Sequence, residues 1–194
     1  DFYHGILQRH LYAAPAERRL LSKNAAFAGW PPFLLERFPD ATIILCVREP
    51  KAALASQLKS LAPARRAFGT DAGGQATRTQ FASLYRDFYL AIDAFVRFAP
   101  GQQVRVVIQE DMRENTRAVL AALRDFIDTM PTDHPRQEAT CPRREAEAEA
   151  EAEAEAEAEA EAETLSQDPA TWHVDAGAAY QRLCESPLTV RVAA

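Results

Sequence analysis

The chain of 194 residues is 47% hydrophobic, which is enough to bury the core of one domain. Its net charge of −6 comes from residues 145–163, which carry ten Glu and no basic residue, whereas elsewhere 22 basic residues face 18 acidic ones. The rest of the chain is therefore mildly basic, which suits a small anionic ligand and falls short of a nucleic-acid surface.

The sequence also disfavours a membrane-spanning protein and a protein built on disulfides or a metal site. No apolar run approaches the roughly 18 to 20 residues that span a bilayer, so we expect no membrane segment and a soluble chain, with the cytoplasm favoured. The cysteines and histidines are scattered without the spacing of a disulfide framework or a metal site, so no metal is expected. Asp1 stands in a segment typical of a helix interior, which predicts that the chain starts within a larger protein.

The first third of the chain alternates helical and extended patterns. We expect a helix over about 2–13, a short apolar stretch at 19–22, and a second helix opened by the prolines at 31 and 32. The β-branched and apolar run at 41–47 is typical of a strand buried on both faces of a parallel sheet. A helix from Glu49 to Leu61 is predicted to follow it.

The middle of the chain continues this alternation. Residues 63–74 contain three glycines and are expected to form a loop before a long amphipathic helix over 77–98. A second strand is predicted at 104–108, then a turn and a helix over 116–127 with Asn115 as its cap. This order predicts an α/β fold with right-handed crossovers, a parallel sheet and helices on its faces.

The composition divides the chain into three parts: a domain over 1–128, a linker over 129–164 and a tail over 165–194. The Glu-Ala repeat of the linker would place like charges at i and i+4 of a helix and leave no apolar side to pack. We expect it to be solvated and partly helical, with weak binding of cations or of a basic partner left open. The tail, which contains Trp172 and Leu183, is predicted to form a short helix that docks on the domain.

Arg48 is the leading candidate for ligand binding. It follows the first predicted strand, and Pro50 then opens a helix whose N-terminus favours an anion. Ser56 comes eight residues after Arg48, roughly 9 Å along that helix, a gap that one phosphate and an Arg side chain can bridge. The spacing leaves a structural alternative open, in which Arg48 pairs with Glu49 or a neighbouring helix and Ser56 faces the sheet.

A series of motifs runs from Arg19 to Leu61. Arg-Leu-Leu-Ser-Lys-Asn precedes a short helix ending in Leu-Glu-Arg-Phe-Pro-Asp-Ala, and the strand that follows leads into Arg-Glu-Pro with Ser56 eight residues after the Arg. Later, residues 107–112 read Val-Ile-Gln-Glu-Asp-Met at the end of the second strand. Together these motifs resemble the sulfotransferase family, over about 110 residues.

The resemblance implies a three-layer parallel sheet of the P-loop and sulfotransferase type, incomplete at its N-terminus. It implies that Arg48 and Ser56 bind the 3′-phosphate of 3′-phosphoadenosine 5′-phosphosulfate, the donor substrate. It further implies transfer of a sulfuryl group to a hydroxyl or amine of a small-molecule or carbohydrate acceptor. Lys23, at the end of a strand in that family, would then stabilise the bridging oxygen as it gains charge.

Two departures from the family pattern bear on activity. No Gly-rich loop of the type Arg-Ser-Gly-Thr-Thr, which holds the 5′-phosphosulfate in the family, is present, because the glycines at 69–74 come too late in the chain. Phe27 takes the place at which many members carry a catalytic His. We therefore expect a fragment that is inactive by itself. Two alternatives stay open: an inactive sulfotransferase-like protein that binds a nucleotide or a partner, and a nucleotide-binding kinase of the P-loop type.

Overall fold

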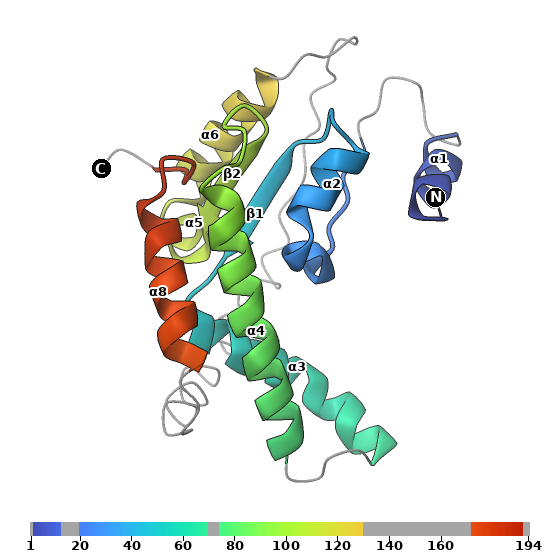
Figure 1. Ribbon diagram of the computed structural model, residues 1–194, viewed down its shortest axis with the longest axis vertical. Helices are drawn as coiled ribbons and strands as arrows, with labels where there is room; N and C mark the ends of the chain where they lie inside the picture. Colours follow the sequence, from blue (N-terminus) through green and yellow to red (C-terminus); the bar gives the residue numbers. More distant parts are fainter. Residues whose placement is uncertain (1, 13–19, 70–73, 130–171, 192–194) are drawn as a thin grey trace.

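The structure is a computed structural model that describes residues 2–12, 20–69, 74–129 and 172–191. Its elements are arranged as a small sheet with helices around it (Figure 1). In chain order they are α1 (Phe2–Tyr12), the 3-10 helix η1 (Ala25–Gly29), α2 (Pro31–Arg37), β1 (Ile43–Val47), α3 (Pro50–Phe68), α4 (Gln75–Val96), β2 (Val104–Ile108), α5 (Gln109–Glu114), α6 (Thr116–Asp128) and α8 (Trp172–Glu185).

The two strands run parallel and in register, from Ile43 opposite Val104 to Val47 opposite Ile108. A third segment extends this sheet on the far side of β2. The Val106 N–H donates to the carbonyl of Leu188 at 3.0 Å, and the Val190 N–H donates to the carbonyl of Val106 at 2.9 Å. The predicted α/β class with parallel strands is therefore confirmed for the described residues, on a sheet of two strands and one added bridge.

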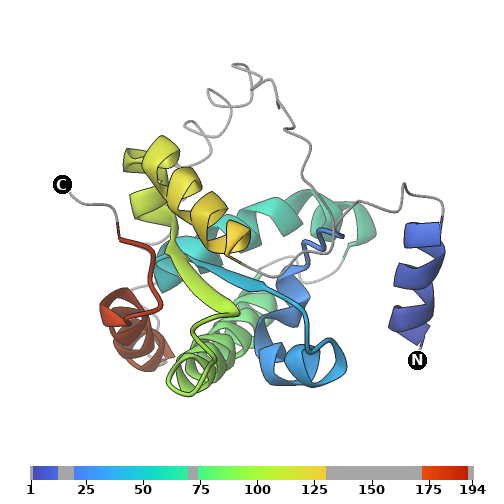
Figure 2. The same ribbon diagram turned by 90° about the horizontal axis from the view of Figure 1, so that it is seen from above.

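Alternate residues of β2 face opposite sides of the sheet, as the pleat requires. Val104, Val106 and Ile108 belong to the apolar cluster that α4 and α8 complete. Val107 belongs to a second cluster with Val119 and Leu123 of α6. Seen from above, α6 accordingly lies on one side of the strands, while α4 and α8 lie on the other (Figure 2). This two-sided burial explains why the strand appears in the sequence as a nearly continuous apolar run.

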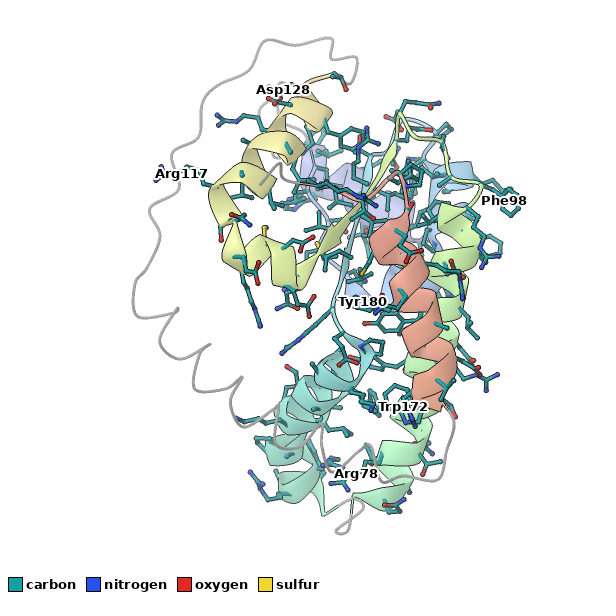
Figure 3. All side chains as sticks on the ribbon, turned by 90° about the vertical axis from the view of Figure 1, so that its left-hand side faces the viewer. Arg78, Phe98, Arg117, Asp128, Trp172 and Tyr180 are labelled. Carbon is teal, nitrogen blue, oxygen red and sulfur yellow. The ribbon has the colours of Figure 1, made fainter. Side chains whose placement is uncertain are left out.

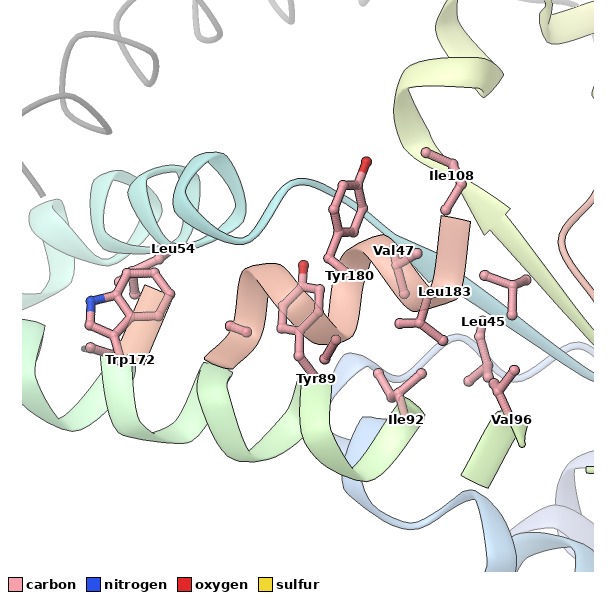
Figure 4. Close-up of a cluster of buried hydrophobic side chains, with 14 of the residues drawn as sticks. Leu45, Val47, Leu54, Tyr89, Ile92, Val96, Ile108, Trp172, Tyr180 and Leu183 are labelled. Carbon is pink, nitrogen blue, oxygen red and sulfur yellow. The ribbon is translucent and has the colours of Figure 1, made fainter. Parts of the chain in front are cut away.

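The larger cluster lies where α3, α4 and α8 meet the end of β1 (Figure 4). Leu54 and Leu58 of α3 are almost completely buried, as are Ala176 and Leu183 of α8. Burying one such leucine stabilises the fold by about 1.5 to 3 kcal/mol. The small alanines of α8 allow its backbone to approach α4 closely, which is why these two helices make the most extensive helix contact in the described chain.

An ion cluster around the buried carboxylate of Asp93 also joins α4 to α8. Asp93 is only 5% exposed, and its Oδ2 atom lies 2.7 Å from Nη2 of Arg97 and 2.8 Å from Nη2 of Arg182. Burial acts to raise the pKa of Asp93, but the hydrogen bonds from Arg182 and Arg97 outweigh it and hold this pKa below its usual value. The carboxylate therefore stays ionised, with two arginines as partners.

Helix α3 is longer than predicted and contains Pro63, at which a loop was expected to begin. The prediction was wrong because the residues after Pro63 are mostly Ala and Arg, which favour helix strongly enough to continue it. The helix ends instead at Gly69, whose φ of 63° lies in the left-handed region. The Gly69 N–H bonds back to the carbonyls of Arg65 and Arg66, a common way to end a helix.

Two shorter expectations were also wrong. The strand that the resemblance implied before Lys23 does not form at Leu20 and Leu21, and Leu21 is 90% exposed. A short helix, α5, replaces the turn expected after β2. Asn115 does occupy the N-cap position of α6, but its side chain makes no capping hydrogen bond, and α5 runs into α6 with only this residue between them.

The Glu-Ala repeat at 145–163 lies outside the described residues, so the division into 1–128, 129–164 and 165–194 stays a prediction. Helix α8 belongs to the predicted tail, and Figure 3 shows it running alongside α4 with Trp172 and Tyr180 on it. Within the described ranges, no helix combines the length and the apolar character that crossing a membrane requires.

Candidate functional site

The carboxyl ends of β1 and β2 lie side by side because the strands are parallel and in register. Arg48 follows one strand and Gln109 the other, each directly after the last paired residue. Ligands of open α/β sheets bind at this edge. The candidate site is therefore the set of residues gathered here around the connection between β1 and α3, which we call the strand-end site.

Arg48 is half-buried at this edge, and its Nε atom is buried without a hydrogen-bond partner among the described residues. Its main-chain carbonyl accepts a hydrogen bond of 2.5 Å from the hydroxyl of Tyr89 on α4. In the part of the chain that the structure describes, Arg48 forms no ion pair with Glu49. A buried donor left unpaired costs about 1 to 3 kcal/mol, so this guanidinium is suited to an acceptor from a ligand.

Glu49 caps α3 instead of pairing with Arg48. One of its carboxylate oxygens accepts from the Ala52 N–H at 2.7 Å, in the first turn of the helix. The protein's own carboxylate therefore occupies part of the positive end of the helix dipole, where the sequence had suggested room for an external anion. Attraction for an anion at this edge consequently depends mainly on Arg48.

Ser56 lies two turns into α3 and is half-buried. The buried side of the helix is carried by Leu54 and Leu58. Ser56 is four residues after Ala52, so the helical repeat places these two on one side, opposite the two leucines. Ser56 thus shares the side of α3 that carries the capped amide, and its part in binding stays a prediction.

Glu110, at the end of β2, is the centre of a hydrogen-bond network that the sequence did not reveal. Its Oε1 atom accepts from the Glu49 N–H at 3.1 Å, and its Oε2 atom accepts from the Tyr180 hydroxyl at 3.0 Å. The rings of Tyr180 and Tyr89 meet edge to face, with centroids 6.4 Å apart (Figure 4). In the sequence, Glu110 stood out only as part of the motif at residues 107–112.

Both tyrosines are buried and act as hydrogen-bond donors. Burial raises the pKa of Tyr89, and it raises the pKa of Tyr180, to which the hydrogen bond and charge of Glu110 add a further increase. Both hydroxyls therefore keep their protons at neutral pH. Tyr89 lies within the amphipathic helix predicted over 77–98 and Tyr180 within the predicted tail, but the sequence assigned neither residue a role at the site.

A cavity of about 500 Å³ adjoins this network on the side of β2 that is away from β1. Glu110 and Tyr180 form part of its wall, whereas Arg48 and Ser56 do not. The cavity is bounded by the end of β2, by α8 and by the C-terminal segment, through Ile108, Glu110, Asp111, Asn115, Tyr180, Gln181, Cys184, Thr189 and Arg191.

Lys23 belongs to neither of the strands that form the strand-end site, nor to the helix that follows β1. It is exposed in the irregular segment before η1, which is capped by the side chain of Asn24. Phe27, which takes the place of the family's catalytic His, contacts Tyr3 edge to face and stacks on Trp30. No strand ends at Lys23, so its proposed catalytic role has no support from the local backbone and stays a prediction.

The remaining reactive groups do not form a second centre. Desolvation raises the pKa of the thiols of Cys46 and Cys184, which makes both poor nucleophiles at neutral pH. Among the residues that the structure describes, no three His, Cys, Asp or Glu side chains come together in a way that could hold a metal ion. Buried side-chain nitrogens without a partner also occur at Arg65, Trp172 and His173, but among the described residues only that of Arg48 follows the carboxyl end of a strand.

A family model described as "Sulfotransferase family" matches residues 1–134. The matched range includes β1, β2 and the connection that carries Arg48, and it ends before α8. No curated protein and no solved structure gave a significant match.

Proposed function

The chain belongs to the sulfotransferase family, and from this we propose that it binds 3′-phosphoadenosine 5′-phosphosulfate, through its 3′-phosphate, for sulfuryl transfer. Membership supports a transferase that acts on small-molecule acceptors. In this proposal the acceptor offers a hydroxyl or amine on a small molecule or carbohydrate. The two described strands then belong to a three-layer sheet of the P-loop type.

The observation that carries the proposal is the buried, unpartnered Nε of Arg48 at the carboxyl end of β1. A phosphate there would give this N–H an acceptor and would place a negative charge beside the guanidinium, the combination that makes charge-assisted hydrogen bonds strong. Ser56, on the following helix, would add one neutral hydrogen bond. The donor, when bound, supplies the sulfuryl group.

Lys23 would serve the reaction by neutralising charge that develops on the bridging oxygen, since sulfuryl transfer depends mainly on alignment and charge stabilisation. Phe27 cannot accept the proton of an acceptor hydroxyl, and residues 1–194 contain no Gly-rich loop for the phosphosulfate. We therefore expect the chain to bind nucleotide through the 3′-phosphate and not to transfer the sulfuryl group by itself.

The test is a calorimetric titration of the 194-residue chain with 3′-phosphoadenosine 5′-phosphate and with adenosine 5′-phosphate. Wild type should prefer the first ligand. Arg48→Ala should weaken that ligand by roughly 30- to 900-fold, or about 2 to 4 kcal/mol, and Ser56→Ala by about fivefold. Both effects should be much smaller for adenosine 5′-phosphate, which has no 3′-phosphate.

Arg117→Ala is the matched control, because Arg117 is exposed on α6 and its removal lowers the net charge by the same amount (Figure 3). It should leave both affinities within about twofold. Equal weakening of both nucleotides by Arg48→Ala, or none, would show that Arg48 does not bind the 3′-phosphate.

The alternative within the family is an inactive member that binds nucleotide or a partner, which Phe27 and the missing loop favour. A transfer assay with labelled donor and a panel of hydroxyl and amine acceptors tests whether residues 1–194 are active. Labelled product above the uncatalysed rate would establish an active enzyme and rule out the inactive member, whereas binding without product agrees with both readings. The family match favours either of these over a P-loop kinase.

A further inference from the structure

The peptide unit that joins Arg48 to Glu49 is held at both of its polar ends. Its carbonyl, from Arg48, accepts the hydroxyl of Tyr89 at 2.5 Å. Its N–H, from Glu49, donates to Oε1 of Glu110 at 3.1 Å. The second oxygen of Glu110 is in turn held by the Tyr180 hydroxyl at 3.0 Å. One peptide plane is thus fixed from α4 and, through Glu110, from α8.

Fixing this plane restricts the backbone torsion on either side of it. These are ψ of Arg48 and φ of Glu49, which decide how α3 is oriented relative to the Arg48 side chain, and so how this side chain is placed against the helix that carries Ser56. Rotating the plane would break the bonds to Tyr89 and Glu110 together. Because both tyrosines are less than 10% exposed, water cannot easily replace their hydroxyls as partners.

We propose that Tyr89 and Tyr180, the latter through Glu110, are positioning residues that hold Arg48 ready for the 3′-phosphate. This inference rests on the proposed function, because it concerns the same ligand. Tyr180 stands on α8, beyond residues 1–134 that match the family, so part of the support for Arg48 comes from a segment outside the matched range. A guanidinium that is already oriented loses less conformational freedom on binding, which raises affinity.

The proposal predicts a selective loss of affinity when either hydroxyl is removed. Tyr89→Phe and Tyr180→Phe keep the buried rings and remove one hydrogen bond each. Each should weaken 3′-phosphoadenosine 5′-phosphate by about fivefold and change adenosine 5′-phosphate little. Tyr85→Phe is the matched control, one turn earlier on α4 and half-buried, and should leave both affinities unchanged.

The double variant tests whether the two tyrosines act on the same peptide. Once one hydrogen bond is lost, the peptide plane can rotate and the second hydrogen bond restricts it less. The losses of affinity in the two single variants should therefore not multiply in the double variant. We expect the double variant to weaken binding by clearly less than the product of the single effects. A full product would show two independent contributions and would contradict the shared peptide.

Calorimetric titrations and thermal unfolding of the same samples distinguish positioning from simple stabilisation. Lower thermal midpoints with unchanged preference for the 3′-phosphate would overturn the proposal and leave the proposed function standing. No preference for the 3′-phosphate in wild type would instead overturn the proposed function itself.

If a tyrosine variant does not fold, substitutions of Glu110 test the same proposal. Glu110→Ala removes the acceptor of the Glu49 N–H and should abolish most of the preference, whereas Glu110→Gln keeps an acceptor oxygen and should restore it. Equal behaviour of these two variants would contradict the proposal.

Discussion

Asp93 of α4 and Arg182 of α8 meet in a contact where Oδ2 of Asp93 lies 2.9 Å from Nε and 2.8 Å from Nη2 of Arg182. The carboxylate is buried, while the Arg182 side chain is 43% exposed. The contact joins the part of the chain that matches the family to the helix beyond it. It therefore offers a way to test how strongly α8 is attached.

Asp93→Asn should lower the free energy of unfolding by about 1 to 3 kcal/mol, because it removes the charge from a buried, hydrogen-bonded group. The half-exposed arginines remain solvated, which keeps the loss below that of a fully buried pair. Urea denaturation at pH 7 measures the difference. Asp87→Asn, at an exposed position of the same helix, is the control and should change stability by less than about 0.5 kcal/mol. Similar values for both variants would show that the cluster contributes little.

The same cluster should make stability depend on pH in the acid range. The pKa of Asp93 is lowered from its usual value of 3.8, so its contribution is fully present above that pH and is lost as the pH falls through the lower, folded-state value. The gap in urea midpoint between wild type and Asp93→Asn should therefore stay constant from pH 7 to about pH 5 and narrow below about pH 4. A gap that widened on acidification would contradict the assigned direction.

Glu49→Gln should strengthen the binding of 3′-phosphoadenosine 5′-phosphate, by about two- to fivefold at low salt. The substitution removes a negative charge beside Arg48 and keeps an oxygen that can cap the Ala52 N–H. The gain should shrink as salt is raised, which a titration series in increasing NaCl would show. An affinity that fell at every salt concentration would mean that Glu49 supports binding through its charge.

Two glycines with empty space around them should respond to alanine in opposite directions. Gly69 and Gly177 both have nothing within 4 Å of the position of an added Cβ. Gly69 has a φ of 63°, so Gly69→Ala should cost about 1 to 2 kcal/mol in backbone strain. Gly177 lies within α8, so Gly177→Ala should stabilise by about 0.5 to 1 kcal/mol. Thermal unfolding of the two variants compares them directly, and shifts of the same sign would contradict this account.

The sequence predicted most accurately the bounds of the strands, which are covered on both faces of the sheet. Strand β2 was predicted to the residue and β1 to within two residues, because apolar runs of this kind have few other uses. The position of Arg48 at a strand end followed from β1. The end of α3 was predicted too early because a proline usually ends a helix, whereas here the alanines and arginines after Pro63 continue it.

The support around Arg48 could not be predicted in the same way. Tyr180 and Glu110 are 70 residues apart, and their contact leaves no periodic pattern in either segment. The strand that the resemblance implied before Lys23 is absent for a related reason, since a short apolar stretch becomes a strand only where a neighbouring strand accepts its hydrogen bonds. In both cases the deciding partner is remote in sequence.

The pairing of Val106 with Leu188 and Val190 has a consequence for synthesis of the protein. Until residues 172–190 have left the ribosome, one edge of β2 has open hydrogen-bonding groups and α4 has an uncovered apolar face. Residues 1–134 therefore keep this strand edge and this apolar face exposed until α8 and residues 188–190, which are translated after the acidic repeat, can cover them. At roughly 5 to 20 residues per second, translating residues 135–190 takes about 3 to 11 seconds. Binding of a chaperone during that interval would be most useful along the edge of β2 and the adjoining face of α4.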